Sequence, residues 1–158
     1  MRHIIIAMAL GLVITSCGEK EEKKKDGFEI NRTQAEEKAP EAVEVPVDLD
    51  NKGIGPITEL TFSDSIDEEM AAKGKSTFDA ICIACHMTDQ RMIGPAMTGV
   101  YERRSPEWVM NMILNPDEML LKDPIAKALL KEYNNMIMLD QNLSEEDARA
   151  VAEYLRTL

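Results

Sequence analysis

Histidine is scarce in this 158-residue chain, which contains only two. Cysteine is almost as rare, at three residues, and aromatic side chains make up only 4% of the sequence. Basic residues are outnumbered, because 18 Lys and Arg stand against 29 Asp and Glu, for a net charge of −11. This balance argues against nucleic acid as a partner, since phosphates require cationic contacts. It suits a protein that docks on a partner with a basic face.

Residues 1–16 have the pattern of a secretory signal peptide, with a short positive start and an apolar run over residues 4–14. That run is shorter than the roughly 20 residues that a membrane span needs, but it fits a signal core. The segment ends in Ile14-Thr15-Ser16-Cys17, which resembles the bacterial lipobox. We therefore expect cleavage before Cys17 and lipidation of its sulfur. An ordinary signal peptide that happens to contain a cysteine is the alternative.

Residues 17–45 are predicted to form a lipidated cysteine followed by a disordered, charged tether. The stretch 18–46 holds nine acidic and six basic residues with few large apolar ones, so it cannot bury a core. Several acyl chains are expected on a lipobox cysteine, and they would give a stable membrane anchor. The predicted location is the bacterial cell envelope, facing the periplasm, with the cell surface as the alternative.

The rest of the chain is predicted to be an all-α domain over residues 65–158, preceded by an irregular arm over residues 46–64. The arm is rich in turn-forming Pro, Gly and Asn. Serines with acidic residues three positions later predict helix starts at Ser65 and Ser144. Since no segment alternates with a two-residue period, no sheet is expected. The expected helices cover residues 65–81, 106–114, 124–133 and 144–158, with Asn115-Pro116 ending the second.

The segment Cys82-Ile83-Ala84-Cys85-His86 is the C-x-x-C-H pattern of covalent haem c attachment. Two thiols three positions apart reach the two vinyl groups of one haem, and the adjacent imidazole becomes an axial ligand of the iron. A structural zinc site would need four ligands, and a thioredoxin-like pair would need a βαβ context, which is not visible. After signal removal His86 is the one histidine left, so the sequence predicts one covalent haem without a second histidine ligand.

From about residue 65 onward, the chain resembles the class I, mono-haem cytochrome c family. The haem motif carries this resemblance together with residues 94–103, Gly-Pro-Ala-Met-Thr-Gly-Val-Tyr-Glu-Arg, which are similar to the family's G-P-x-L-x-G-x-x-x-R segment. The resemblance implies a cytochrome c fold of about four short helices around one covalent haem. It also implies that the first and last helices cross, and Gly74, Phe78 and Tyr154 fit that contact.

The resemblance further implies the roles of residues around the haem. The Pro95 carbonyl would accept a hydrogen bond from the axial histidine, and Met97 would pack on the haem face. Arg103 would meet a haem propionate through a charge-assisted hydrogen bond. Arg104 is the alternative propionate partner, and the indole N–H of Trp108 is a further donor. A solvated surface position is the alternative for both arginines.

The sixth iron ligand is expected to be a methionine, because the family usually places one five residues before the hydrophobic residue that opens the last helix. Counting back from Leu143 gives Met138, with Met136 as the alternative. The chain departs from the family pattern at Leu139, where proline is usual. An open site without methionine is the third possibility.

Family resemblance implies a membrane-anchored electron shuttle from a quinol-oxidising complex to a terminal oxidase or reductase. Segments at 51–56 and 106–116 look like those of cytochromes that accompany nitrous oxide reductase in Bacteroidetes-type bacteria. No enzyme activity and no small-molecule substrate are expected, since a second C-x-x-C-H and a nucleophile constellation are missing. The alternative function is a haem-based gas or redox sensor with a displaceable methionine.

Overall fold

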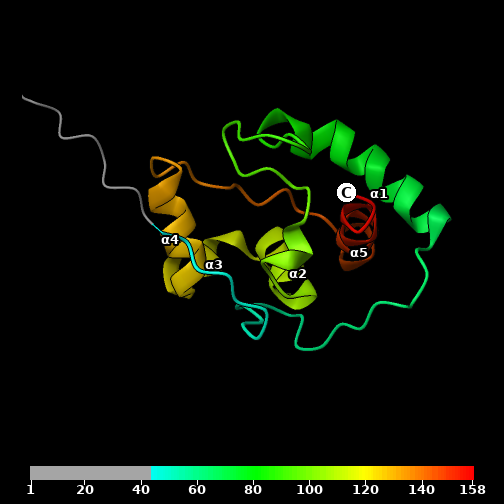
Figure 1. The fold of residues 1–158 in the computed structure, drawn as a ribbon, viewed down its shortest axis with the longest axis horizontal. Helices are drawn as coiled ribbons and strands as arrows, with labels where there is room; N and C mark the ends of the chain where they lie inside the picture. The colour runs from blue at the N-terminus through cyan, green and yellow to red at the C-terminus, as the bar shows by residue number, and fades with distance from the viewer. Residues whose placement is uncertain (1–43) are drawn as a thin grey trace, which may run out of the picture. The chain divides into compact units, whose positions relative to one another are not determined.

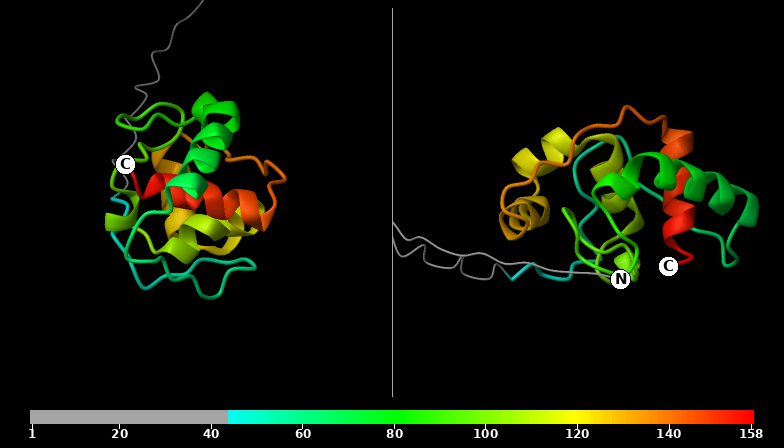
Figure 2. Two further views of the ribbon diagram at one scale, coloured as in Figure 1. Left: turned by 90° about the vertical axis from the view of Figure 1, so that its right-hand side faces the viewer. Right: turned by 90° about the horizontal axis from the view of Figure 1, so that it is seen from above.

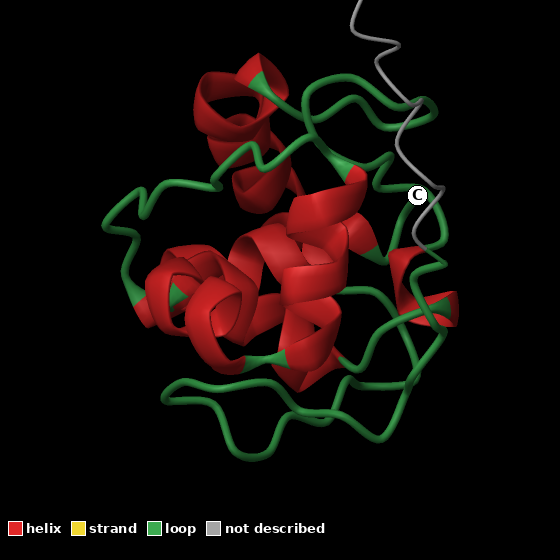
Figure 3. Ribbon diagram, turned by 90° about the vertical axis from the view of Figure 1, so that its left-hand side faces the viewer, coloured by secondary structure: helices red, strands yellow, loops and turns green. Residues whose placement is uncertain are grey.

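The computed structural model of the protein describes residues 44–158, so the predictions for the signal peptide and for Cys17 lie outside the described residues. The described chain forms five α-helices and two short 3-10 helices, and over this range it has no strand beyond one isolated bridge, which confirms the all-α prediction (Figure 3). Over the same range, no helix has both the length and the apolar content that crossing a membrane requires. The α-helices are α1 (Glu68–Ile81), α2 (Pro106–Leu114), α3 (Pro116–Lys122), α4 (Pro124–Glu132) and α5 (Glu145–Leu155) (Figure 1).

Helices α1 and α5 cross in direct contact, as the right-hand view of Figure 2 shows. The crossing is built around Gly74, because a Cβ atom at this position would lie only 1.9 Å from the carbonyl oxygen of Ala150. The absence of a side chain therefore lets the two backbones approach each other. Beside this point, the rings of Phe78 and Tyr154 pack with their centroids 5.4 Å apart. The predicted crossing of the first and last helices is confirmed.

The start of α1 differs from the sequence-based expectation. Its N-cap is Asp67, whose side chain accepts from the backbone N–H of Met70 at 2.9 Å, and Ser65 lies outside the helix. The backbone N–H of Asp67 donates to the buried carboxylate of Glu153 on α5 at 3.0 Å. A contact between two distant parts of the chain thus fixes where α1 begins. The predicted cap of α5 is confirmed, since Ser144 accepts from the Asp147 N–H at 3.1 Å.

Helix α3 is absent from the sequence-based prediction, in which Asn115-Pro116 ended the second helix and the next helix began at residue 124. Asn115 does end α2, and its N–H donates to the carbonyl of Asn111 at 2.9 Å. Pro116 then opens the next helix at its first position, where the missing N–H is not needed. The buried Met119 anchors α3, and its sulfur accepts from the N–H of Ile54 at 3.0 Å.

The arm ahead of α1 has no regular secondary structure, but it is tightly bound to α2. The buried side chain of Asn111 donates to the carbonyls of Lys52 and Ile57, each at 2.8 Å, and accepts from the Ile57 N–H at 2.9 Å. Gly53 has a positive φ of 73° and lies against Met119, with no room for a Cβ atom. The arm therefore packs as part of the helical domain and covers α2 and α3.

Candidate haem site

The C-x-x-C-H segment forms a tight turn immediately after α1. Residues Cys82–Ala84 make a 3-10 helix, and the Cys82 carbonyl accepts from the N–H of Cys85 at 3.0 Å and of His86 at 2.9 Å. Both thiols are free; Cys82 is half-buried and Cys85 is exposed. Burial, with a smaller contribution from Cys85, raises the pKa of Cys82 to about 11. The Cys82 thiol is therefore neutral near pH 7.

The imidazole of His86 is held in one orientation by a hydrogen bond to the loop that follows it. Its Nδ1 lies 3.0 Å from the carbonyl oxygen of Pro95. Since a carbonyl can only accept, Nδ1 carries the proton and Nε2 keeps its lone pair for a metal. Such a hydrogen bond fixes the ring and increases its basicity as a ligand. The contact predicted between His86 and Pro95 is present in the structure.

Gly94 forms the surface against which the His86 ring packs. A Cβ atom at this position would lie 2.5 Å from Cε1 and 2.8 Å from Nδ1 of the ring. The Gly94 N–H also donates to the Cys85 carbonyl at 2.8 Å, which folds the loop back onto the motif. The glycine is present in the family-like segment of the sequence, but its packing against the imidazole follows only from the structure.

The structure gives the two predicted propionate arginines backbone partners. Arg103 donates to the carbonyls of Ala96 and Thr98, each at 3.0 Å, and so braces the loop behind His86. A guanidinium has further donors, so its contact with a propionate stays a prediction. Arg104 is buried and donates to the carbonyl of Pro46 at 2.8 Å, which ties the arm to the loop. The solvated-surface alternative is wrong for Arg104.

Trp108 also has a partner different from the predicted one. Its indole N–H donates to the buried carboxylate of Asp123 at 3.1 Å. Asp123 is the N-cap of α4 and accepts in addition from the Ala126 N–H at 2.8 Å and the Asn51 amide at 2.7 Å. A buried carboxylate needs such donors, and Trp108 supplies one of them. The indole thus joins α2 to α4, and its single N–H is used by Asp123 and not by a propionate as predicted.

The two methionines proposed as sixth ligand lie in the connection between α4 and α5. Met136 is 55% exposed, whereas Met138 is half-buried between the exposed residues Ile137 and Leu139. Both side chains lie on the connection that would face the haem, so Met138 stays the predicted ligand and Met136 the alternative. Met97 is partly buried and packs against the main core cluster.

Exposed apolar side chains concentrate on the two segments that would enclose a haem. Large apolar residues normally become buried, and an exposed group of them indicates a surface that something covers. A macrocycle held between the His86 loop and the Met138 connection would cover such side chains. The donor set and this apolar surface both fit a haem. Among residues 44–158, six of the ten exposed large apolar side chains lie on these segments: Ile83, Met92, Ile93, Met136, Ile137 and Leu139.

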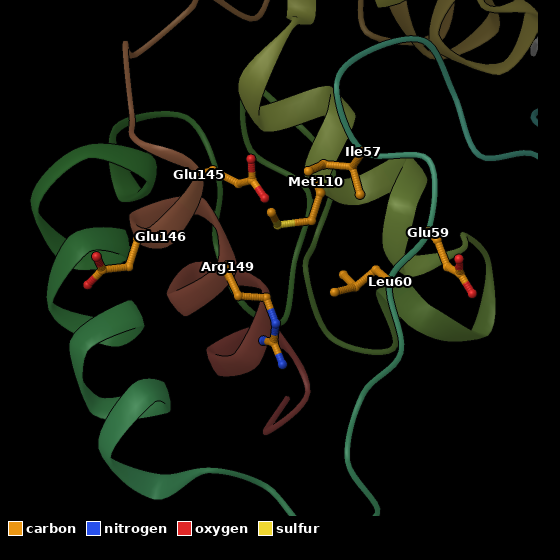
Figure 4. A pocket seen from close by; sticks show the side chains of 7 residues that line it. All are labelled: Ile57, Glu59, Leu60, Met110, Glu145, Glu146 and Arg149. Carbon is orange, nitrogen blue, oxygen red and sulfur yellow. The ribbon is translucent and has the colours of Figure 1, made fainter.

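A surface cavity elsewhere in the domain is not the haem site. It has a volume of about 390 Å³ and lies between the arm, α2 and the start of α5 (Figure 4). None of its lining residues is a histidine or cysteine, and Arg149 is already paired with Glu153. The cavity is lined by Ile57, Glu59, Leu60, Met110, Glu145, Glu146 and Arg149.

Comparisons with known proteins identify the family of the helical domain. Residues 71–158 match the family model for cytochrome c. The chain is similar to the cytochrome c from Rhodothermus marinus, with 44% identity, a TM-score of 0.63, and coverage of 65% of this chain and 88% of that one. It is also similar to the cytochrome c domain of a Pseudomonas putida protein, with 32% identity, a TM-score of 0.50, and coverage of 53% and 85%. No match was found among curated proteins.

Proposed function

Because the chain belongs to the cytochrome c family, we propose that it is a membrane-anchored carrier that moves single electrons between two larger redox complexes. Membership of the family implies one covalent haem c and electron transport, and family members are typically carriers and not enzymes. One observation of the site supports this most directly. The His86 ring is fixed by Pro95 through Nδ1, which leaves Nε2 free for the iron.

The chemistry of the ligands explains why such a site suits a carrier. When bound, the haem iron supplies a one-electron couple. His86 and the thioether of Met138 would hold the iron, and a thioether ligand raises the reduction potential. Ligands that stay bound in both oxidation states would allow an electron to move with little structural rearrangement. The hydrogen bond from His86 to Pro95 keeps the ring in place during that change.

We assign the electron donor to a quinol-oxidising complex and the acceptor to a terminal oxidase or reductase, with nitrous oxide reductase as the candidate acceptor. Support comes from the acidic balance of the chain, 29 Asp and Glu against 18 Lys and Arg, which suits partners with basic docking faces. The nitrous oxide reductase assignment rests on the likeness of residues 51–56 and 106–116 to cytochromes associated with that enzyme.

The proposed anchor is a lipid on Cys17, which holds the domain at the periplasmic face of the membrane. Native protein purified from membranes is expected to begin at Cys17 and to carry the mass of its acyl chains, because the preceding Ile-Thr-Ser resembles a lipobox. Mass spectrometry of the intact N-terminal peptide measures this directly. Cys17→Ser should appear in the soluble fraction. An unmodified N-terminus at another residue would disprove the anchor.

A sensor with a displaceable methionine is the second candidate, and the absence of a stiffening proline at Leu139 favours it. Carbon monoxide separates the two functions, because it binds ferrous haem only when the sixth position is open. For a carrier we expect slow or absent binding to the reduced native protein at neutral pH, followed by stopped-flow absorbance. Rapid binding would contradict the carrier and support the sensor.

A further inference from the structure

The loop that holds His86 is fastened to the end of α4 by Arg91. The Arg91 guanidinium donates to the carboxylate of Glu132, and a second nitrogen donates to the Glu132 backbone carbonyl at 2.6 Å. The same guanidinium lies over the ring of Tyr133, 4.0 Å from its centroid. These three contacts, named here the Arg91 clamp, join segments 41 residues apart in the sequence.

The loop on one side of the clamp is well ordered by its own hydrogen bonds. The N–H of Thr98 donates to the Thr88 carbonyl at 2.7 Å, and the Thr98 hydroxyl donates to the same oxygen at 2.7 Å. The Met97 N–H donates to the Met87 carbonyl at 3.2 Å. The loop that carries Arg91 is thus held by its own hydrogen bonds, and its position is set by the turn that contains His86.

The connection on the other side of the clamp begins in a tightly defined way. Asn134 and Asn135 both have left-handed backbones, with φ of 56° and 58°. The Asn135 N–H donates to the Leu130 carbonyl at 2.7 Å, and the Met136 N–H donates to the Tyr133 carbonyl at 3.0 Å. The direction in which the chain leaves α4 therefore follows from where Tyr133 is held.

After residue 136, the position of the connection depends on how its two ends are held. Within the described residues, none of the backbone N–H groups from 137 to 143 donates to another backbone carbonyl outside a helix. Asn142, with φ of 52°, and the Ser144 cap of α5 close the far end. A segment with few hydrogen bonds of its own opens readily, so its anchors decide where Met138 lies.

We propose that Arg91 is a positioning residue for the sixth iron ligand: it couples the His86 loop to the start of the connection that carries Met138. This inference rests on the proposed function, because it takes His86 and Met138 as the axial pair. Arg91 makes its hydrogen bonds and its ring contact with Glu132 and Tyr133, and acts on the ligand through them. Arginine is suited to this task because its planar fork makes two hydrogen bonds while its face stacks on an aromatic ring.

Arg91→Gln in the haem-loaded protein tests the proposal through the lability of the sixth ligand. We expect carbon monoxide to bind the reduced variant about tenfold faster than the native protein, since loss of the ion pair and the stacking frees the connection. Hydrogen exchange at residues 134–136, whose backbone N–H groups are hydrogen-bonded, should be faster, while exchange in α1 and α5 stays native. Arg91→Lys should also bind faster than native, because lysine keeps the charge but not the fork or the flat face.

Lys122→Gln is the matched control, since the Lys122 side chain is about as exposed as that of Arg91, forms an ion pair with Glu118 on α3, and its change also removes one positive charge. Its carbon monoxide rate should stay native. The proposal is overturned if Arg91→Gln binds within twofold of the native rate, or if Arg91→Lys is indistinguishable from native. Met138→Ala measured alongside separates the two ideas. If Met138→Ala binds carbon monoxide at the native rate, the assignment of Met138 as ligand is wrong. If Met138→Ala binds rapidly while Arg91→Gln binds at the native rate, only the proposed role of Arg91 is wrong.

Discussion

A variant in which Cys82 and Cys85 are both replaced by serine is expected to carry no covalently bound haem. Each thiol forms a thioether by adding its sulfur and hydrogen across a vinyl double bond, and a serine hydroxyl is far too weak a nucleophile for this addition. The structure leaves both thiols free on one turn, with Cys82 half-buried and Cys85 exposed. The loss should be complete, and haem staining after denaturing electrophoresis together with the intact protein mass measures it.

Cys17→Ser is the control for this experiment, because it removes the third cysteine without touching the haem turn. It should keep the full amount of covalent haem. The single variants Cys82→Ser and Cys85→Ser should each keep one thioether, and their absorption spectra should be shifted from that of the native protein. Haem that remains bound to the denatured double variant would show that the attachment lies elsewhere.

Met138→Ala is expected to open the sixth position of the iron. If the native methionine occupies that position all but about 1% of the time, its removal raises the rate of carbon monoxide binding about 100-fold. The reduction potential should fall as well, because the thioether raises it. Stopped-flow absorbance of the reduced protein and a spectroelectrochemical titration measure the two effects.

Met136→Ala is the natural control, since Met136 lies two residues away on the same connection and is 55% exposed. Its carbon monoxide rate and potential should match the native protein. The reverse result, with Met136→Ala fast and Met138→Ala native, would move the ligand to Met136. Slow binding in both single variants would contradict a methionine ligand from this connection.

The sequence predicted much of the helical framework because the signals for it are local. Ser144 followed by Asp147 gave the start of α5, and the breaks at Asn115 and Pro124 gave boundaries within a residue or so. The first helix was placed three residues too early, because Ser65 and Asp67 both have the chemistry of a cap. A hydrogen bond from Asp67 to Glu153 on α5 selects between them, and that contact spans 86 residues.

Helix α3 shows a different limit of local patterns. Proline after asparagine indicates a helix end, and this was correct for α2. The same proline is equally suited to the first position of a new helix, and only the burial of Met119 against the arm shows that α3 forms. Asn115 and Pro116 therefore end α2 and also begin α3.

By itself, the sequence predicted one covalent haem, attached at Cys82 and Cys85, with His86 as its histidine ligand, because the other histidine lies in the predicted signal peptide. Covalent attachment needs three residues at fixed spacing, and counting histidines needs no coordinates. Tertiary structure alone decided how that histidine is held and what surrounds it. Packing brings Gly94 against the ring, turns the Trp108 indole to Asp123 instead of a propionate, and places Arg91 on Glu132. These partners are chosen by proximity in the folded chain, because each donor could have satisfied its hydrogen bonds with several acceptors.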